Sequence, residues 1–266
     1  LAFRNLKRNW RRSITTGLAI TSGFVGLALL GGYIIRVQNG LRANTTYINL
    51  QGHLQVRMVD SMERYSISPK KYVIRPELDD KIMRILDKHK PSVEFYGKFL
   101  TASGLIVADN ISQPFISRSA EPEVFFKAIH HPTVSAWAQG WVKNIESYTE
   151  DKFKQSDLIS ITTRISDILG RSFENGYFTE PDVQLMTRTF ENDLNAVNAR
   201  LGLIHTTGVA LAEDTSIRVP LKLMQDLMAT DGYQYVALFL NEPGKAHSLK
   251  EKIKKEILEL QLPLEV

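Results

Sequence analysis

The stretch SITTGLAITSGFVGLALLGGYII, Ser13–Ile35, contains no charged residue and is the only run of this length and kind in the sequence. As an α-helix its 23 residues would extend about 35 Å, enough to cross a hydrocarbon core of about 30 Å. Five basic residues and no acidic residue precede it: Arg4, Lys7, Arg8, Arg11 and Arg12. Positive charge concentrates on the cytoplasmic side of a spanning helix. The sequence therefore predicts a membrane helix with these five residues as its interface anchor, residues 1–12 in the cytoplasm and residues 40–266 outside.

A cleaved signal peptide is the alternative interpretation, because it too has a basic start and an apolar middle. The apolar part of a signal peptide runs about 7–15 residues and ends at a cleavage site made of small residues. The uncharged run here is longer, and Leu29-Leu30-Gly31-Gly32 offers no good cleavage site. The sequence thus favours an uncleaved anchor.

Small residues inside the run fall on one arc of a helix. Ala19 with Gly23, and Ser22 with Gly26, are pairs of small residues four positions apart, which let the backbone of a second helix approach closely. The alternative is composition alone, since membrane helices are generally rich in glycine. We predict that these four residues form a helix-packing face.

The charge of the chain is unevenly distributed. The net charge is +4, yet residues 1–42 hold seven Lys or Arg and no Asp or Glu, which leaves 26 basic and 29 acidic residues elsewhere. This distribution suits a cytoplasmic membrane face and argues against a nucleic-acid-binding surface. The absence of cysteine excludes disulfides and cysteine-based metal or redox sites.

The residues before the span form a specific motif. The segment LAFRNLKRNWRRS, residues 1–13, interleaves apolar and basic residues as an interfacial helix does. It closely resembles the start of the permease subunits of bacterial ABC transporters of the macrolide-exporter and lipoprotein-release type (MacB-, LolC/LolE- and FtsX-like). The matching residues are Ala2, Arg4, Asn5, Leu6, Arg8, Asn9, Arg12 and Ser13.

The resemblance continues beyond the span. Gly52–Val56, GHLQV, is similar to a strand that these permeases carry after their first membrane helix, and residues 199–208, ending in HTTG, resemble a later strand and turn. The resemblance implies an inner-membrane permease with four spans and a large periplasmic domain between the first two. It further implies a separate cytoplasmic ATPase, a second permease copy, and in some relatives a periplasmic adaptor or lipoprotein carrier.

The remaining patterns predict an α+β fold. Strands are expected near residues 53–58, 93–100, 104–108, 114–117, 184–191 and 235–240, and helices from Pro76, from Pro122 to Ile129, and from Ala246 onward. We expect residues 1–40 to form the leader and membrane helix, and residues 41–266 a periplasmic core domain. Within this domain, residues 45–129 and 200–266 are expected to build one discontinuous α/β unit of two β-α-β-like halves. Residues 130–199, where the pattern is irregular, are expected to be an inserted subdomain.

Residues for catalysis are scarce. The sequence has no phosphate-binding loop of the Walker type and no nucleophile elbow, and adjacent histidines at 130 and 131 point apart on a helix, which favours a structural role over a metal site. Phe125-Phe126 and the Trp137/Trp141 pair are interpreted as core residues and not as a ligand-binding box. We therefore predict no catalytic residue, no metal and no cofactor in this chain.

Two functions remain open at this point. The first is a permease that couples ATP hydrolysis in a partner subunit to a periplasmic conformational change, for export or lipoprotein release. The second is a single-span sensor or envelope-assembly scaffold with a periplasmic α/β binding domain. The leader motif and the small-residue pairs favour the permease, and we expect the chain to be part of a longer polypeptide. The transported substrate is not encoded in any motif.

Overall fold

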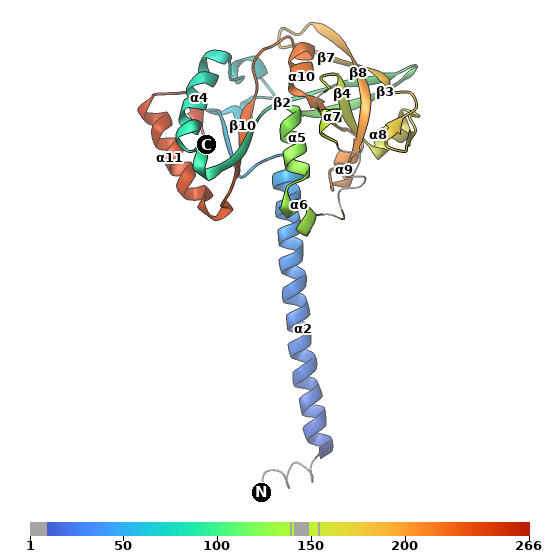
Figure 1. Ribbon diagram of the computed structural model, residues 1–266, viewed down its shortest axis with the longest axis vertical. Coiled ribbons are helices and arrows are strands. Elements are labelled where there is room, and N and C mark those ends of the chain that lie inside the picture. The colour runs from blue at the N-terminus through green and yellow to red at the C-terminus, as the bar shows by residue number, and fades with distance from the viewer. Residues whose placement is uncertain (1–9, 139, 141–148, 154) are drawn as a thin grey trace. The chain divides into compact units, whose positions relative to one another are not determined.

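The computed structural model describes residues 10–138, 140, 149–153 and 155–266 and divides the chain into two units after Arg42. In the first unit, helix α2 (Trp10–Ala43) includes the whole uncharged run and extends eight residues beyond Ile35 (Figure 1). The helix is long and apolar enough to cross a membrane, and its apolar side chains are exposed. A helix that is apolar on all sides needs an apolar surrounding, which the predicted bilayer would provide.

The second unit contains a four-stranded antiparallel sheet built from both ends of the domain. Strand β1 (Leu54–Met58) pairs with β10 (Tyr235–Leu240), with Leu54 opposite Leu238. The other side of β10 pairs with the first half of β2 (Val93–Ala108), and the short β11 (Leu264–Glu265) lies beyond β1. Strands from both ends of residues 43–266 therefore lie side by side in one sheet.

Helices cover both faces of this sheet. Helices α4 (Pro76–Lys88) and α11 (Ala246–Glu259) pack with Val236 and Leu238 of β10 in one hydrophobic core. Helix α5 (Pro122–Ile129) packs with the alternate residues of β10 in a second core. Because side chains of a strand alternate between faces, the two cores lie on opposite sides of the sheet. The helices expected from Pro76, Pro122 and Ala246 are confirmed.

The second half of β2 belongs to a closed ring of strands. The other five strands, in ring order, are β3 (Ile111–Ala120), β9 (Ser216–Pro220), β4 (Leu158–Thr162), β8 (Leu194–His205) and β7 (Asp182–Arg188). Strand β7 pairs back to β2, where Met186 lies opposite Leu105. The β3–β9 and β4–β8 pairs are parallel, and the other pairs are antiparallel. Closure leaves this six-stranded barrel without a free strand edge.

Strand β2 joins the sheet and the barrel in one element, where the sequence predicts two separate strands. Its buried residues are odd-numbered up to Phe99 and even-numbered from Leu100 onward. The face that is packed therefore changes at this point: Phe99 belongs to the core beneath α5, and Leu100 to the core shared with the barrel. A change of phase breaks the two-residue period, which explains why the sequence pattern splits the strand.

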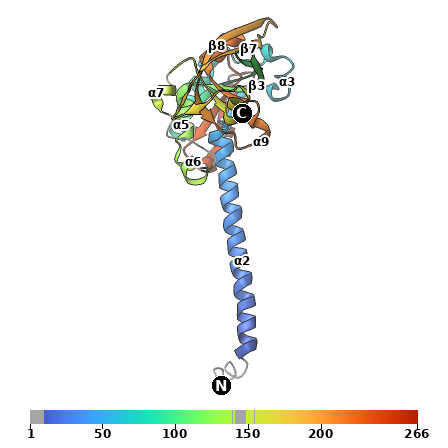
Figure 2. The ribbon, with the colours of Figure 1, turned by 90° about the vertical axis from the view of Figure 1, so that its right-hand side faces the viewer.

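The remaining elements are short. They are η1 (Asn44–Ile48), α3 (Ser61–Arg64), η2 (Pro69–Lys71), η3 (Lys90–Ser92), α6 (Pro132–Trp137), α7 (Glu150–Phe153), α8 (Thr163–Ile168), β5 (Phe173–Glu174), β6 (Tyr177–Phe178), α9 (Ala210–Glu213), α10 (Leu221–Met228) and η6 (Pro243–Lys245). Helix α10 contributes Met224 and Leu227 to the core shared with the barrel. Figure 2 shows α5 beside α7 on one side of the domain. Trp141 lies outside the described residues, whereas Trp137 ends α6 and is partly exposed.

The segment expected as an insertion, residues 130–199, supplies β4, β7 and the first part of β8. These strands are hydrogen-bonded to β9 and β2, so the segment is part of the continuous sheet that runs through residues 43–266. Its assignment as a separate subdomain, and the boundaries at residues 129 and 200, stay a prediction.

Candidate functional site

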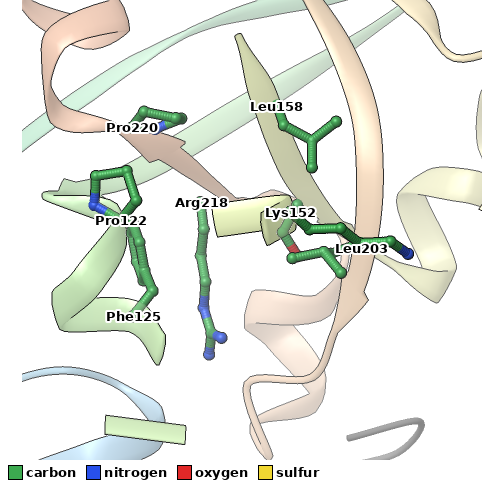
Figure 3. A pocket seen from close by; sticks show the side chains of 8 residues that line it. Pro122, Phe125, Lys152, Leu158, Leu203, Arg218 and Pro220 are labelled. Carbon is green, nitrogen blue, oxygen red and sulfur yellow. The ribbon is translucent and has the colours of Figure 1, made fainter. Parts of the chain in front are cut away.

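The described residues contain no group of three or more His, Asp or Glu side chains that could hold a metal ion. One small cavity, of about 20 Å³, lies among Phe125, Lys152, Leu158 and Arg218, and Figure 3 shows Arg218 extending into it from β9. A cavity of this size has room for about one water molecule. Larger and more open pockets, of about 150 to 910 Å³, lie elsewhere on residues 43–266. The contacts that fix the start of the domain form the candidate site.

The segment Asn44–His53 follows α2 in the chain and is held tightly by the rest of the domain. Ile48 and Leu50 are 1% and 2% exposed, in the core beneath α5. We call this segment, together with the side chains that bind it, the junction. The binding residues are Arg118, His131, Thr207, Gly208, Arg218, Leu238 and Leu240.

Two arginines bind backbone carbonyl groups at the end of η1. One carbonyl belongs to Ile48, the last residue of η1, and the other belongs to the next residue, Asn49. Arg218 Nη2 donates to the carbonyl oxygen of Ile48 at 2.7 Å, and Arg118 Nη1 donates to that of Asn49. Carbonyl groups at a helix C-terminus lack partners within the helix and carry partial negative charge, so a cation there is favourable. Hydrogen bonds from a charged donor are about twice as strong as neutral ones. The arginines thus tie the end of η1 to strands β3 and β9.

Two asparagines and the Thr207-Gly208 turn form a second set of contacts. Asn49 Nδ2 donates to Asn44 Oδ1 at 3.1 Å and to the carbonyl oxygen of Thr207 at 3.2 Å. Gly208 has a φ of +69°, a conformation that glycine adopts without strain, and a Cβ atom there would also lie 2.8 Å from Asn44 Nδ2. The carboxylate of Glu213 accepts hydrogen bonds from the Thr207 backbone and hydroxyl at 2.6 and 2.7 Å and fixes the turn.

The Gly52-His53 pair attaches the segment to β10. Gly52 has a φ of +67°, and a Cβ atom there would lie 2.9 Å from the carbonyl oxygen of Leu238, so a larger residue is disfavoured by both conformation and space. The backbone N–H of Leu240 donates to His53 Nδ1 at 3.0 Å. Only an unprotonated Nδ1 can accept this hydrogen bond. Burial, with a smaller contribution from His131, lowers the pKa of His53 and favours that neutral form.

Aromatic contacts complete the junction. The ring of Tyr47 stacks on that of His131 with centroids 4.0 Å apart, and meets His53 edge-on at 5.8 Å. His131 Nε2 lies 3.1 Å from a carboxylate oxygen of Glu94 on β2. Burial, and then the charge of Glu94, raise the pKa of Tyr47 to about 12, so the phenol stays neutral. The structural role expected for the histidine pair fits these contacts of His131.

The predicted helix-packing residues lie on the exposed surface of α2. Ser22 Oγ donates to the carbonyl oxygen of Ala19 at 3.1 Å, and a Cβ atom on Gly23 or Gly26 would meet nothing within 4 Å. The packing role of these four residues stays a prediction.

The interface anchor also stays a prediction. Arg11 and Arg12 are exposed in the first turn of α2. Arg4, Lys7 and Arg8 lie outside the described residues.

Sequence reasoning missed the two arginines of the junction. The GHLQV and HTTG segments are recognisable as sequence motifs, whereas the strands that contain Arg118 and Arg218 carry no motif. The two arginines are 100 residues apart in the sequence, and only the pairing of β3 with β9 brings them together. A useful signal would have been a lone arginine at a partly buried position of each strand.

Comparisons with known proteins return similar folds only. No protein-family model and no curated protein matches this chain. The extracellular domain of the noncanonic ABC-type transporter YknZ from Gram-positive bacteria is 10% identical, with a TM-score of 0.48 over 80% of this chain and 98% of that chain. The periplasmic region of MacB from Actinobacillus actinomycetemcomitans is 12% identical, with a TM-score of 0.44 over 76% of this chain and 82% of that chain.

A third neighbour is a domain of a candidate permease protein from Porphyromonas gingivalis. It is 11% identical, with a TM-score of 0.37 over 65% of this chain and 68% of that chain. The description of the first neighbour thus names an ABC-type transporter, and that of the third names a permease.

Proposed function

We propose that this chain acts in a permease subunit of an ABC transporter. In this proposal α2 spans the bacterial inner membrane with its N-terminus in the cytoplasm, and residues 40–266 lie in the periplasm. A separate cytoplasmic ATPase hydrolyses ATP, and two permease copies move their periplasmic domains in response, for export or lipoprotein release. The leader motif, the apolar helix and the GHLQV and HTTG segments support this proposal.

The junction is the single observation that carries the mechanism. A segment that follows a mobile membrane helix can pass on its displacement only if it is fixed to a rigid body. Residues 44–53 are fixed by charge-assisted bonds from Arg118 and Arg218, by the Asn49 amide and by the His53 imidazole. These contacts reach β3, β9, β10 and the Thr207 turn, so displacement of the segment moves the strands of the sheet and barrel together.

The first experiment tests the orientation. An alkaline phosphatase fusion after Val266 should be active, and a green fluorescent protein fusion at the same position should be dark, because five basic residues precede the span. An inactive phosphatase with a fluorescent partner fusion would overturn the orientation and the transport mechanism with it.

The second experiment tests the partner. The full-length protein, purified from its native membrane with an affinity tag, should retain a cytoplasmic ATPase in stoichiometric amounts, and the complex in nanodiscs should hydrolyse ATP. Purification with a signalling or envelope-assembly protein, and without any ATPase, would favour the sensor or scaffold alternative.

A further inference from the structure

A pocket of about 150 Å³ opens beside the end of η1, next to the two arginines of the junction. Its polar lining comes from three strands and three connecting segments. The polar lining residues are Asn49, Thr101, Ser117, Arg118, Thr207, Thr215, Ser216 and Arg218. About 10–15 Å³ of such space is enough for one water molecule. The pocket therefore has room for a group of the size of a phosphate.

Strand pairing brings the two cations onto one face. Arg118 lies opposite Arg218 in the parallel β3–β9 pair, and Thr101 lies opposite Arg118 in the antiparallel β2–β3 pair. Directly paired residues project from the same face of a sheet, so these three side chains form a row across three strands. Like charges placed directly opposite one another destabilise a strand pair. A bound anion between or beside the guanidinium groups would be attracted by both positive charges.

Donor groups remain for such an anion. A guanidinium has five N–H donors, and the bond from Arg118 to the Asn49 carbonyl uses one of them. In the described part of the chain, no hydrogen-bond partner is found for the hydroxyl groups of Thr101 and Thr215, which line the pocket. Glu213, beside the lining residue Thr207, is already engaged by the Thr206 and Thr207 hydroxyls.

We propose that this pocket binds a phosphate group. Arg118 and Arg218 would donate charge-assisted hydrogen bonds to its oxygens, and the Thr101 and Thr215 hydroxyls would complete its coordination. A phosphate group matches both the size of the pocket and the planar fork of a guanidinium, which binds two oxygens at once. The phosphate can belong to a lipid headgroup or to a soluble phosphate, and this site does not depend on the transport function proposed above.

The test uses the full chain in maltoside micelles, because this detergent carries no phosphate. One arm titrates inorganic phosphate against chloride at equal ionic strength, and the other adds phosphatidylglycerol to the micelles. Binding is measured from the rise in the midpoint of thermal unfolding and from the NMR signal of arginine Nε–H groups. Arg118→Gln should weaken binding about 30-fold or more, because it removes a charged donor.

A second variant keeps the test valid if Arg118→Gln disrupts the junction, where Arg118 also binds the Asn49 carbonyl. Thr101→Val with Thr215→Val keeps both arginines and should weaken binding about 10-fold, because two neutral hydrogen bonds are lost. Arg84→Gln, at an exposed position of α4, removes one positive charge elsewhere and should leave binding unchanged.

The outcomes separate the sources of the phosphate. The site is supported, and assigned to a soluble phosphate, if inorganic phosphate binds and if Arg118→Gln weakens this binding most, the double threonine variant weakens it less, and Arg84→Gln leaves it unchanged. A response to phosphatidylglycerol alone, with the same order, assigns it to a lipid headgroup. No response in either arm, or a response that the threonine and Arg118 variants leave unchanged, overturns the proposal.

Discussion

The uncharged run Ser13–Ile35 and the junction segment Asn44–His53 are close in sequence and opposite in their surroundings. Apolar side chains of α2 such as Leu18, Phe24 and Leu27 are 64–73% exposed in the described chain, whereas Ile48 and Leu50 of the junction are 1% and 2% exposed. The helix finds no partner within its own unit, and the junction finds nearly all of its partners within the domain. The difference indicates that the helix depends on lipid or other helices, and that the junction depends on the fold of residues 43–266.

This contrast leads to different consequences of mutation. Substitutions in the junction should lower the stability of the domain, because they remove contacts that the domain itself provides. Substitutions on α2 should leave that stability unchanged and act only where the helix meets its surroundings. The four predictions below test this difference, from the largest expected change in the free energy of unfolding to the smallest.

Gly52→Ala should destabilise the domain by about 2–4 kcal/mol. The added Cβ atom would lie 2.9 Å from the Leu238 carbonyl oxygen, at a φ of +67° that side chains rarely adopt. Denaturant unfolding of the purified chain measures the loss. Gly244→Ala is the matched control, because its Cβ atom would meet nothing within 4 Å, and it should change stability by less than about 0.5 kcal/mol. Equal stability of the two variants would show that the GHLQV segment does not hold β10 closely.

Asn49→Ala should cost about 1–2 kcal/mol and reduce coupling. It removes two hydrogen bonds and leaves the carbonyl group of the buried Asn44 amide without its donor. An environment-sensitive fluorophore at the exposed Leu258 reports the ATP-dependent movement of the domain in the assembled complex, and its response should fall while ATP turnover persists.

Asn195→Ala separates coupling from stability. Its amide likewise donates two hydrogen bonds, to the carbonyl oxygens of Asp226 and Leu227, outside the junction. We expect a similar loss of stability and an unchanged fluorescence response. The junction would lose its proposed role if both asparagine variants responded to ATP alike.

Acidification should lower the stability of the domain through buried histidines. The folded pKa of His53 is lowered by burial and then by His131, and that of His205 is lowered well below 6.5 by burial and then by Arg218. The unfolded chain therefore takes up protons first, so the stabilisation is complete above about pH 6.5 and is lost as the pH falls toward the folded pKa values.

Unfolding measured between pH 7.5 and 5.5 tests this pH dependence. His53→Gln should reduce the slope of stability against pH, because glutamine takes up no proton in this range. His247→Gln, at an exposed position, should retain the slope of the parent chain. An unchanged slope in the His53→Gln variant would contradict the neutral state of His53 in the junction.

Gly23→Leu and Gly26→Leu should leave the unfolding of the domain unchanged, within about 0.5 kcal/mol. Insertion should also persist, because leucine is more favourable than glycine in a bilayer. If the small face packs on other permease helices, the larger side chains should nevertheless reduce the ATP-dependent fluorescence response and transport. Leu27→Ile, on another face, is the control. Normal transport by both glycine variants at normal expression would show that the small-residue pairs have no packing role and reflect only the glycine-rich composition of membrane helices.

Local patterns predict much of the secondary structure, because capping, proline placement and periodicity act over a few residues. Helix α5 begins at Pro122 and ends at Ile129 as expected, and β10 covers the expected residues 235–240. The pattern was wrong at β2, where it divides one strand in two. Both faces of β2 become buried near Phe99 and Leu100, and a two-residue period cannot indicate that change.

By itself, the sequence determined the apolar helix, its basic flank and the α+β character of the domain, because these follow from composition and short-range periodicity. Only the tertiary structure decided that β7 closes a barrel against β2, and that Arg118 and Arg218 meet at the end of η1. Those contacts join residues from 69 to 170 positions apart. Their energy depends on strand register and burial, and neither is written in any local stretch of the chain.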